Sequence, residues 1–89
     1  MEGHLLFIKN TIAQLEHRIQ SAPITEEQKV CAKQKVGCVD LSLLEYLCVH
    51  ASRQLTSINL SYIICFLANL DNDVIAAVFA IEQATVYSV

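Results

Sequence analysis

A series of apolar residues near the N-terminus repeats with alternating spacings of three and four residues. Its members are Leu5, Ile8, Ile12, Leu15, Ile19 and Ala22. Because an α-helix has about 3.6 residues per turn, this spacing places every member on one side of a helix, as in a coiled-coil seam. Pro23 pushes the residue before it out of the α conformation. The pattern therefore predicts a helix over about residues 4–21.

The remainder of the chain also favours helices, because breaks are rare. Two glycines and one proline occur in 89 residues, which argues against turn-rich β architectures. We therefore expect an all-α protein with four to five short helices that form antiparallel hairpins. A chain of this length has room for a single helical domain, residues 1–89.

Local signals predict where the middle helices begin and end. Thr25 opens a capping-box pattern, so a second helix is expected near 26–36, with Val30, Cys31 and Val36 as its contacts. Gly37 suits a left-handed end of that helix. A third helix should follow Asp40, a good N-cap. Its seam comprises Leu41, Leu44, Cys48, Ala51 and Leu55.

The C-terminal part is expected to form a hairpin over about residues 58–87. Polar residues at 56–59 interrupt the apolar pattern, either as a turn or as a distortion within one long helix. A helix should then run to Leu70, and the Asp71-Asn72-Asp73 turn should follow it, with Asp73 as the next cap. The last helix carries Val74, Ala77, Val78 and Ile81 on one face.

The apolar content exceeds what a chain of this size can easily bury. Hydrophobic residues make up 54% of the sequence, whereas a domain this short buries roughly 60–65% of the surface its unfolded chain exposes. We therefore expect a protein partner or self-association. Six Lys and Arg residues and a net charge of -3 leave no basic stripe for phosphates. Nucleic acid is not an expected partner.

Neither a membrane span nor a secretion signal is expected. The apolar stretch from Leu60 to Leu70 would form a helix of about 16 Å, against a hydrocarbon core of roughly 30 Å. The N-terminus begins with an acidic Glu2 where a secretory signal would be basic. Without a secretion signal, we expect the four cysteines to be reduced thiols that pack like small hydrophobic residues, and we expect a cytoplasmic protein.

The polar residues do not form a recognisable catalytic or metal-binding pattern. Cys31 and Cys38 are seven residues apart, and Cys48 and His50 point to different sides of one helix, unlike the paired spacings of zinc sites. The two glycines, Gly3 and Gly37, cannot form a phosphate-binding loop. We expect no enzymatic activity, no metal and no cofactor.

Residues 61–87 resemble one tetratricopeptide-like helical hairpin. The matching positions are Ile64, Cys65 and Ala68 on the first helix and Ala77, Ile81 and Ala84 on the second. Ser61 stands where that repeat usually has tryptophan, Cys65 stands where it has glycine, and no proline closes the unit. Such repeats bury their faces by stacking on neighbours.

The acidic chain of under 100 residues, with its heptad helix and tetratricopeptide-like hairpin, resembles the small chaperones of bacterial type III secretion systems. Those chaperones work in pairs to hold the aggregation-prone needle subunit. The resemblance implies that the apolar faces of the last helices contact a co-chaperone or a needle-subunit helix.

The predicted function is therefore that of a helical interaction protein which holds a partner helix in an apolar groove. The heptad seam is either a core face or a docking face. The predicted partner-binding residues are Leu5, Ile8, Ile12, Leu15, Ile19, Ile63, Phe66, Leu67, Val74, Val78, Phe79 and Ile81. One alternative is a homo-oligomeric adaptor that associates through the first helix or the last hairpin. Another is a small metal or redox protein that uses Cys31, Cys38, Cys48 or Cys65.

Overall fold

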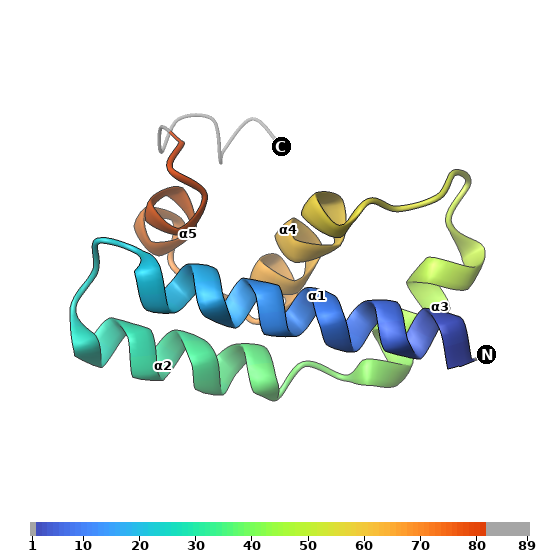
Figure 1. The fold of residues 1–89 in the computed structure, drawn as a ribbon, viewed down its shortest axis with the longest axis horizontal. Helices are drawn as coiled ribbons and strands as arrows, with labels where there is room; N and C mark the ends of the chain where they lie inside the picture. Colours follow the sequence, from blue (N-terminus) through green and yellow to red (C-terminus); the bar gives the residue numbers. More distant parts are fainter. Residues whose placement is uncertain (1, 82–89) are drawn as a thin grey trace.

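The computed structural model describes residues 2–81, and these form an all-α fold, as predicted. Five helices follow one another along the chain (Figure 1). They are α1 Glu2–Ser21, α2 Glu26–Gly37, α3 Leu41–His50, α4 Ser57–Leu67 and α5 Asn72–Phe79. α1 agrees closely with the predicted helix over 4–21, and α2 agrees with the one near 26–36.

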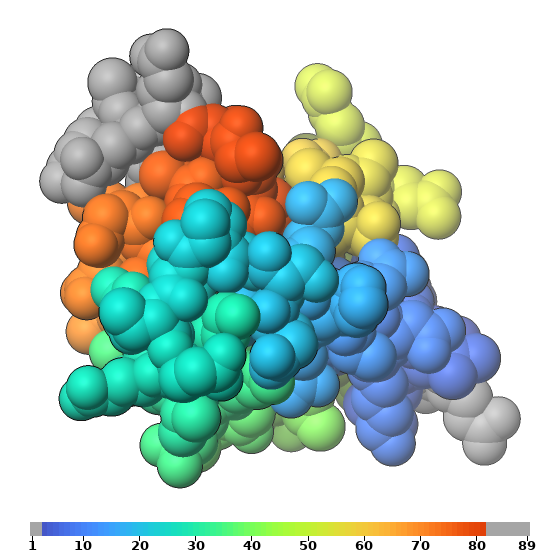
Figure 2. All heavy atoms as spheres, turned by 60° about the vertical axis from the view of Figure 1, so that its left-hand side comes forward, coloured from blue at the N-terminus to red at the C-terminus, as the bar shows by residue number. Residues whose placement is uncertain are grey.

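Helix α1 is the centre of the fold, and the larger helix–helix contacts all involve it. α2 runs antiparallel to α1, whereas α4 and α5 cross α1 and α3 lies beside its N-terminal half (Figure 1). In Figure 2 the end of α1 and the start of α2 (cyan) lie directly against α5 (red). The first two helices thus form an antiparallel hairpin of the predicted kind, and α3, α4 and α5 pack against α1.

The core lies along the heptad face of α1. Ile8, Leu15 and Ile19 are fully buried, together with side chains from each of the other helices. Thr11 is buried within this face, and Ile12 is half-buried beside it. The Thr11 hydroxyl donates a hydrogen bond to the Phe7 carbonyl oxygen at 2.8 Å, so its burial leaves no unpaired donor.

The predicted caps at Thr25 and Asp40 are confirmed. Thr25 accepts a hydrogen bond from the Gln28 backbone, and the Gln28 side chain accepts one from the Thr25 backbone. The Asp40 carboxylate accepts from the Ser42 backbone at 2.9 Å. Thr56 caps α4 in the same way by accepting from the Asn59 backbone. The polar residues at 56–59 therefore mark the start of a new helix, for which Thr56 is the N-cap, and not a distortion within one long helix.

Three sequence expectations for α2 and α3 were wrong. Gly37 is the last helical residue and has an ordinary negative φ, so α2 has no left-handed end. α2 contacts the core through Ala32 and Val36, whereas Val30 and Cys31 are exposed. α3 ends at His50, so Ala51 and Leu55 do not continue its seam; residues 51–56 form a non-helical connection.

The C-terminal helices are shorter than expected. α4 ends at Leu67, and the cap position of α5 is Asp71, with Asp73 inside the first turn. Asn69 and Ala80 adopt left-handed backbone conformations that end α4 and α5. Residues 82–87 of the predicted hairpin, among them Ala84, lie outside the described residues.

The tetratricopeptide-like packing of the last two helices stays a prediction. The rings of Tyr62 and Phe79 stack with centroids 4.3 Å apart and join α4 to α5. Each of these helices nevertheless has its larger contact with α1. In the described part of the chain, α1 thus supplies the packing surface that a neighbouring repeat would otherwise provide.

Candidate functional site

The N-terminal residues that were predicted to bind a partner lie mainly inside the protein. Ile8, Leu15 and Ile19 have no exposed surface, and Leu5 and Ile12 are half-buried. Their neighbours are the other four helices, because α1 contacts each of them. In this conformation the heptad seam is a core face, and it offers a partner no continuous surface.

The C-terminal candidates divide into two groups. Val74 and Val78 are buried in the core, and the half-buried members are Ile63, Phe79 and Ile81. Phe66 and Leu67, at the end of α4, are 46% and 43% exposed. These two side chains are the predicted binding residues that solvent reaches most freely.

Leu67 lines a shallow groove between α2 and the turn that joins α4 to α5. This groove has a volume of about 310 Å³ and is lined by Gln34, Lys35, Cys38, Val39, Leu67 and Ala68. A smaller hollow of about 60 Å³ lies further along α2, where Lys35 is again a wall residue. It is lined by Gln28, Cys31, Ala32, Lys35, Leu70, Asp71 and Val74.

The charges along this α2 groove are unevenly placed. Lys35 is the cation shared by its two parts, and Asp71 is the carboxylate at the smaller end. The α2 residues that line the two hollows, from Gln28 to Lys35, span about 10 Å, which is the length of about two turns of a helix. The two hollows, which we together call the α2 groove, therefore combine apolar lining with Lys35 in both hollows and Asp71 in the smaller one.

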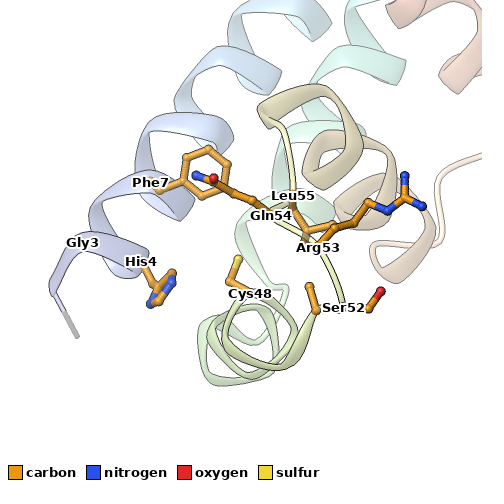
Figure 3. A pocket seen from close by; sticks show the side chains of 9 residues that line it. Gly3, His4, Phe7, Cys48, Ser52, Arg53, Gln54 and Leu55 are labelled. Atoms are coloured by element: carbon orange, nitrogen blue, oxygen red, sulfur yellow. The ribbon is translucent and has the colours of Figure 1, made fainter.

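A third hollow, of about 660 Å³, which we call the His4 hollow, lies where the start of α1 meets the connection from α3 to α4 (Figure 3). Phe7 and Leu55 supply apolar walls, and His4, Cys48 and Gln54 supply polar groups. The Nδ1 atom of His4 is buried without a hydrogen-bond partner. Arg53 also lines this hollow, but its guanidinium points away from His4 and Phe7 (Figure 3). In Figure 2, side chains of this connection (yellow-green) project from the body of the protein.

The chemistry of Cys48 does not suit nucleophilic catalysis in that hollow. Burial, and to a lesser extent the negative charge of Glu45, raise the pKa of the Cys48 thiol. A thiol with a raised pKa stays protonated at neutral pH, and the thiolate is the reactive form. The His4 hollow is therefore better suited to binding than to covalent chemistry.

All four cysteines are free thiols: Cys31 and Cys38 are exposed, Cys48 is half-buried and Cys65 is buried. Within residues 2–81, no three His, Cys, Asp or Glu side chains come together as a metal-ligand set. The helices of this same range include none with the length and apolar character that crossing a bilayer requires.

Sequence reasoning missed the outward face of α3. Leu43, Tyr46 and Val49 are all exposed there, and Leu44 is the fully buried residue of this helix. The sequence did contain a signal for an exposed apolar face. α3 carries apolar residues on every side, and its ionisable polar residues are Glu45 and His50. A short helix of this composition cannot bury all its sides when it leans on one neighbour.

Comparisons with known proteins do not assign the chain to a family. No family model, no curated protein and no solved structure matches it significantly. The fold is therefore defined by its own geometry: a central helix on which four shorter helices pack.

Proposed function

We propose that this protein is a non-enzymatic interaction protein that binds an amphipathic helix of another protein. The observation that carries the proposal is the α2 groove, in which the half-exposed Leu67 lies beside Lys35. Helix-in-groove recognition needs an apolar strip flanked by polar groups that orient the ligand. The groove has both, in Leu67 and Val39 on the apolar side and in Gln34 and Lys35 on the polar side.

The energetics of this groove favour a modest, reversible affinity. Full burial of a Leu side chain is worth about 1.5–3 kcal/mol, and Leu67, which is 43% exposed, has roughly half of its surface left to bury. An ion pair with Lys35 would add less than about 1 kcal/mol at an exposed site. Its main effect is to orient the bound helix, with an acidic residue of that helix beside Lys35.

The finer form of the proposal is a small cytoplasmic chaperone or co-chaperone of a type III secretion needle subunit. It rests on the resemblance in size, charge and helical pattern. The free thiols of Cys31 and Cys38 on the surface suit a reducing compartment. In this role the groove would hold a helix of the needle subunit, or of a paired chaperone. Covering the apolar face of that helix would keep the needle subunit from aggregating.

The first prediction tests the charge of the groove with two fluorescent peptides of about fourteen residues. Both form the same leucine-faced amphipathic helix, and they differ in having Glu or Lys at the edge. Measured by anisotropy, Lys35→Glu should weaken binding of the Glu-edged peptide about tenfold, because an attractive surface charge pair becomes a repulsive one. It should strengthen binding of the Lys-edged peptide for the opposite reason. Leu67→Asp should weaken both.

Val30→Glu is the matched control, since Val30 is 55% exposed on α2 but does not line the groove. It should leave both affinities unchanged. If wild-type protein binds neither peptide at millimolar concentration, or if Lys35→Glu weakens both equally, the groove is not the helix-binding site. A needle-subunit helix in place of the leucine peptide tests the chaperone form separately.

A further inference from the structure

Two exposed thiols lie along the α2 groove. Cys38 lines its larger hollow, Cys31 lines its smaller one, and both thiols are free. They are seven residues apart, so they lie on the same side of α2 at a distance of about 10 Å along its axis. This separation is too long for a disulfide between them. Each thiol is therefore available to a separate molecule.

The cation that the two hollows share lies between these thiols. Lys35 is four residues after Cys31 and three residues before Cys38, so it is a neighbour of both on the helix surface. In the described part of the chain, Lys29 and Lys33 of α2 have side-chain hydrogen-bond partners, whereas Lys35 has none. An anionic compound that reaches either sulfur therefore meets an unpaired positive charge beside it.

The other two thiols are poor candidates for reaction with such a compound. Burial raises the pKa of the Cys65 thiol to about 12, and it also raises the pKa of the Cys48 thiol, so both stay protonated at neutral pH. Thiol–disulfide exchange requires an accessible thiolate. Reaction should therefore be confined to the two thiols of the α2 groove.

We propose that Cys31 and Cys38 are modification sites for a small anionic disulfide such as oxidised glutathione, and that the resulting mixed disulfide closes the α2 groove. This inference rests on the proposed function, because it describes how helix binding in the groove is regulated. Modification follows the ordinary course of thiol–disulfide exchange.

The exchange balances without any further reactant. The protein thiolate attacks one sulfur of oxidised glutathione, whose S–S bond breaks while a protein–glutathione S–S bond forms. The second glutathione leaves as a thiolate and takes up the proton that the protein thiol released. The protein sulfur is oxidised and the departing sulfur is reduced, so an excess of reduced thiol reverses the reaction.

The adduct blocks the groove by its volume and by its charge. A tripeptide on Cys38 fills the hollow of about 310 Å³ beside Leu67, which a bound helix would otherwise use. An adduct on Cys31 covers the smaller hollow. The glutathione carboxylates also neutralise Lys35, the group that orients an acidic partner helix. The groove is thus open when the thiols are reduced and closed when small disulfides accumulate.

Mass spectrometry of the full chain after treatment with oxidised glutathione tests the sites. Adducts should form on Cys31 and Cys38 and not on Cys65. Lys35→Gln and Lys33→Gln are a matched pair, because they change the net charge equally. Lys35→Gln should slow the exchange about threefold, since a surface charge pair is lost, whereas Lys33→Gln should not. With the neutral hydroxyethyl disulfide, both variants should react like wild type.

Peptide anisotropy tests the regulation. The modified wild type should bind the Glu-edged peptide about tenfold more weakly than the reduced protein, because the apolar contact and the ion pair are both lost. Dithiothreitol should restore the affinity. The Cys31→Ser/Cys38→Ser variant keeps Cys48 and Cys65, so treatment with oxidised glutathione should leave its own affinity unchanged.

The outcomes separate this inference from the proposed function. Equal affinity of the reduced and the fully modified wild type would overturn the regulation and leave helix binding intact. Adducts on Cys65 in place of Cys31 and Cys38 would overturn the assignment of the sites, and equal slowing by Lys33→Gln and Lys35→Gln would overturn the role of Lys35. If the reduced wild type binds no peptide, the proposed function fails and the regulation fails with it.

Discussion

At the scale of single residues, burial decides the behaviour of the cysteines. Cys65 on α4 belongs to the core cluster, and burial raises the pKa of its thiol from 9.0 to about 12. Cys31 and Cys38 are exposed on or next to α2. Four residues of one type thus have different chemistry, because their accessibility depends on which helix faces turn toward α1.

The raised pKa of Cys65 predicts a loss of stability in alkali. Above pH 9 the unfolded chain releases the thiol proton while the folded chain keeps it, so the free energy of unfolding falls as pH rises toward 12. Below pH 9 both states are protonated and the contribution is constant. The slope should reach at most about 1.4 kcal/mol per pH unit.

Urea titrations between pH 8 and pH 11 measure this effect. Other groups titrate in that range as well, so the informative quantity is the difference between wild type and Cys65→Ala. This difference should shrink as pH rises, whereas the exposed Cys31→Ala control should follow the wild-type curve. A pH-independent difference would contradict the assignment.

At the scale of helices, side-chain caps define where the elements begin. Thr25, Asp40 and Thr56 each accept a hydrogen bond from a backbone N–H of the first turn, whereas Asp71 makes no side-chain cap bond. The first turn of a helix leaves such donors without partners, so a capping oxygen stabilises the start. Three of the four helix starts after α1 are specified in this way.

Removing a cap therefore has a predictable cost. Asp40→Ala and Thr56→Ala should each lower the free energy of unfolding by about 1 kcal/mol, because a backbone donor loses its acceptor. Asp71→Ala should cost less than half as much, since it removes no such bond. Thermal or urea unfolding measures all three, and an equal cost at Asp71 and Asp40 would refute the capping explanation.

At the scale of the whole molecule, dependence on α1 makes the fold cooperative. α2, α3, α4 and α5 each pack on α1, and their contacts with one another are slight. No pair of outer helices therefore retains a substantial apolar interface once α1 is lost. The molecule should accordingly unfold as one unit.

Leu15→Ala tests this cooperativity, since Leu15 is fully buried in the face of α1. The cavity should cost about 2–5 kcal/mol. Hydrogen exchange should show the same loss of protection in the slow amides of α2, α4 and α5, because all depend on α1. Leu6→Ala, at an exposed position of α1, is the matched control with a small effect. Faster exchange confined to α1 would contradict the central role of this helix.

Much of the helical layout was predictable from local residues. The seam of α1, the capping box at Thr25 and the cap at Asp40 depend on interactions within one turn, so they are visible along the chain. The C-terminal ends were harder to predict. Ala80 adopts a left-handed conformation that alanine disfavours, and Asn69, a residue type that tolerates this conformation, adopts it within a stretch that is apolar on both sides. Of the predicted partner-binding residues, Leu67 and Val74 line the α2 groove, whereas the exposed Phe66 lies outside it.

The amino-acid sequence by itself determined that this protein is helical, where most helices start, and that its apolar content exceeds an easily buried core. The tertiary structure alone decided which apolar faces remain exposed. α3 and α4 carry apolar residues around most of their circumference, so periodicity does not distinguish their inner faces from their outer ones. The distinction arises when Leu44 and Ile64 enter the core along α1, which turns Tyr46 and Phe66 outward.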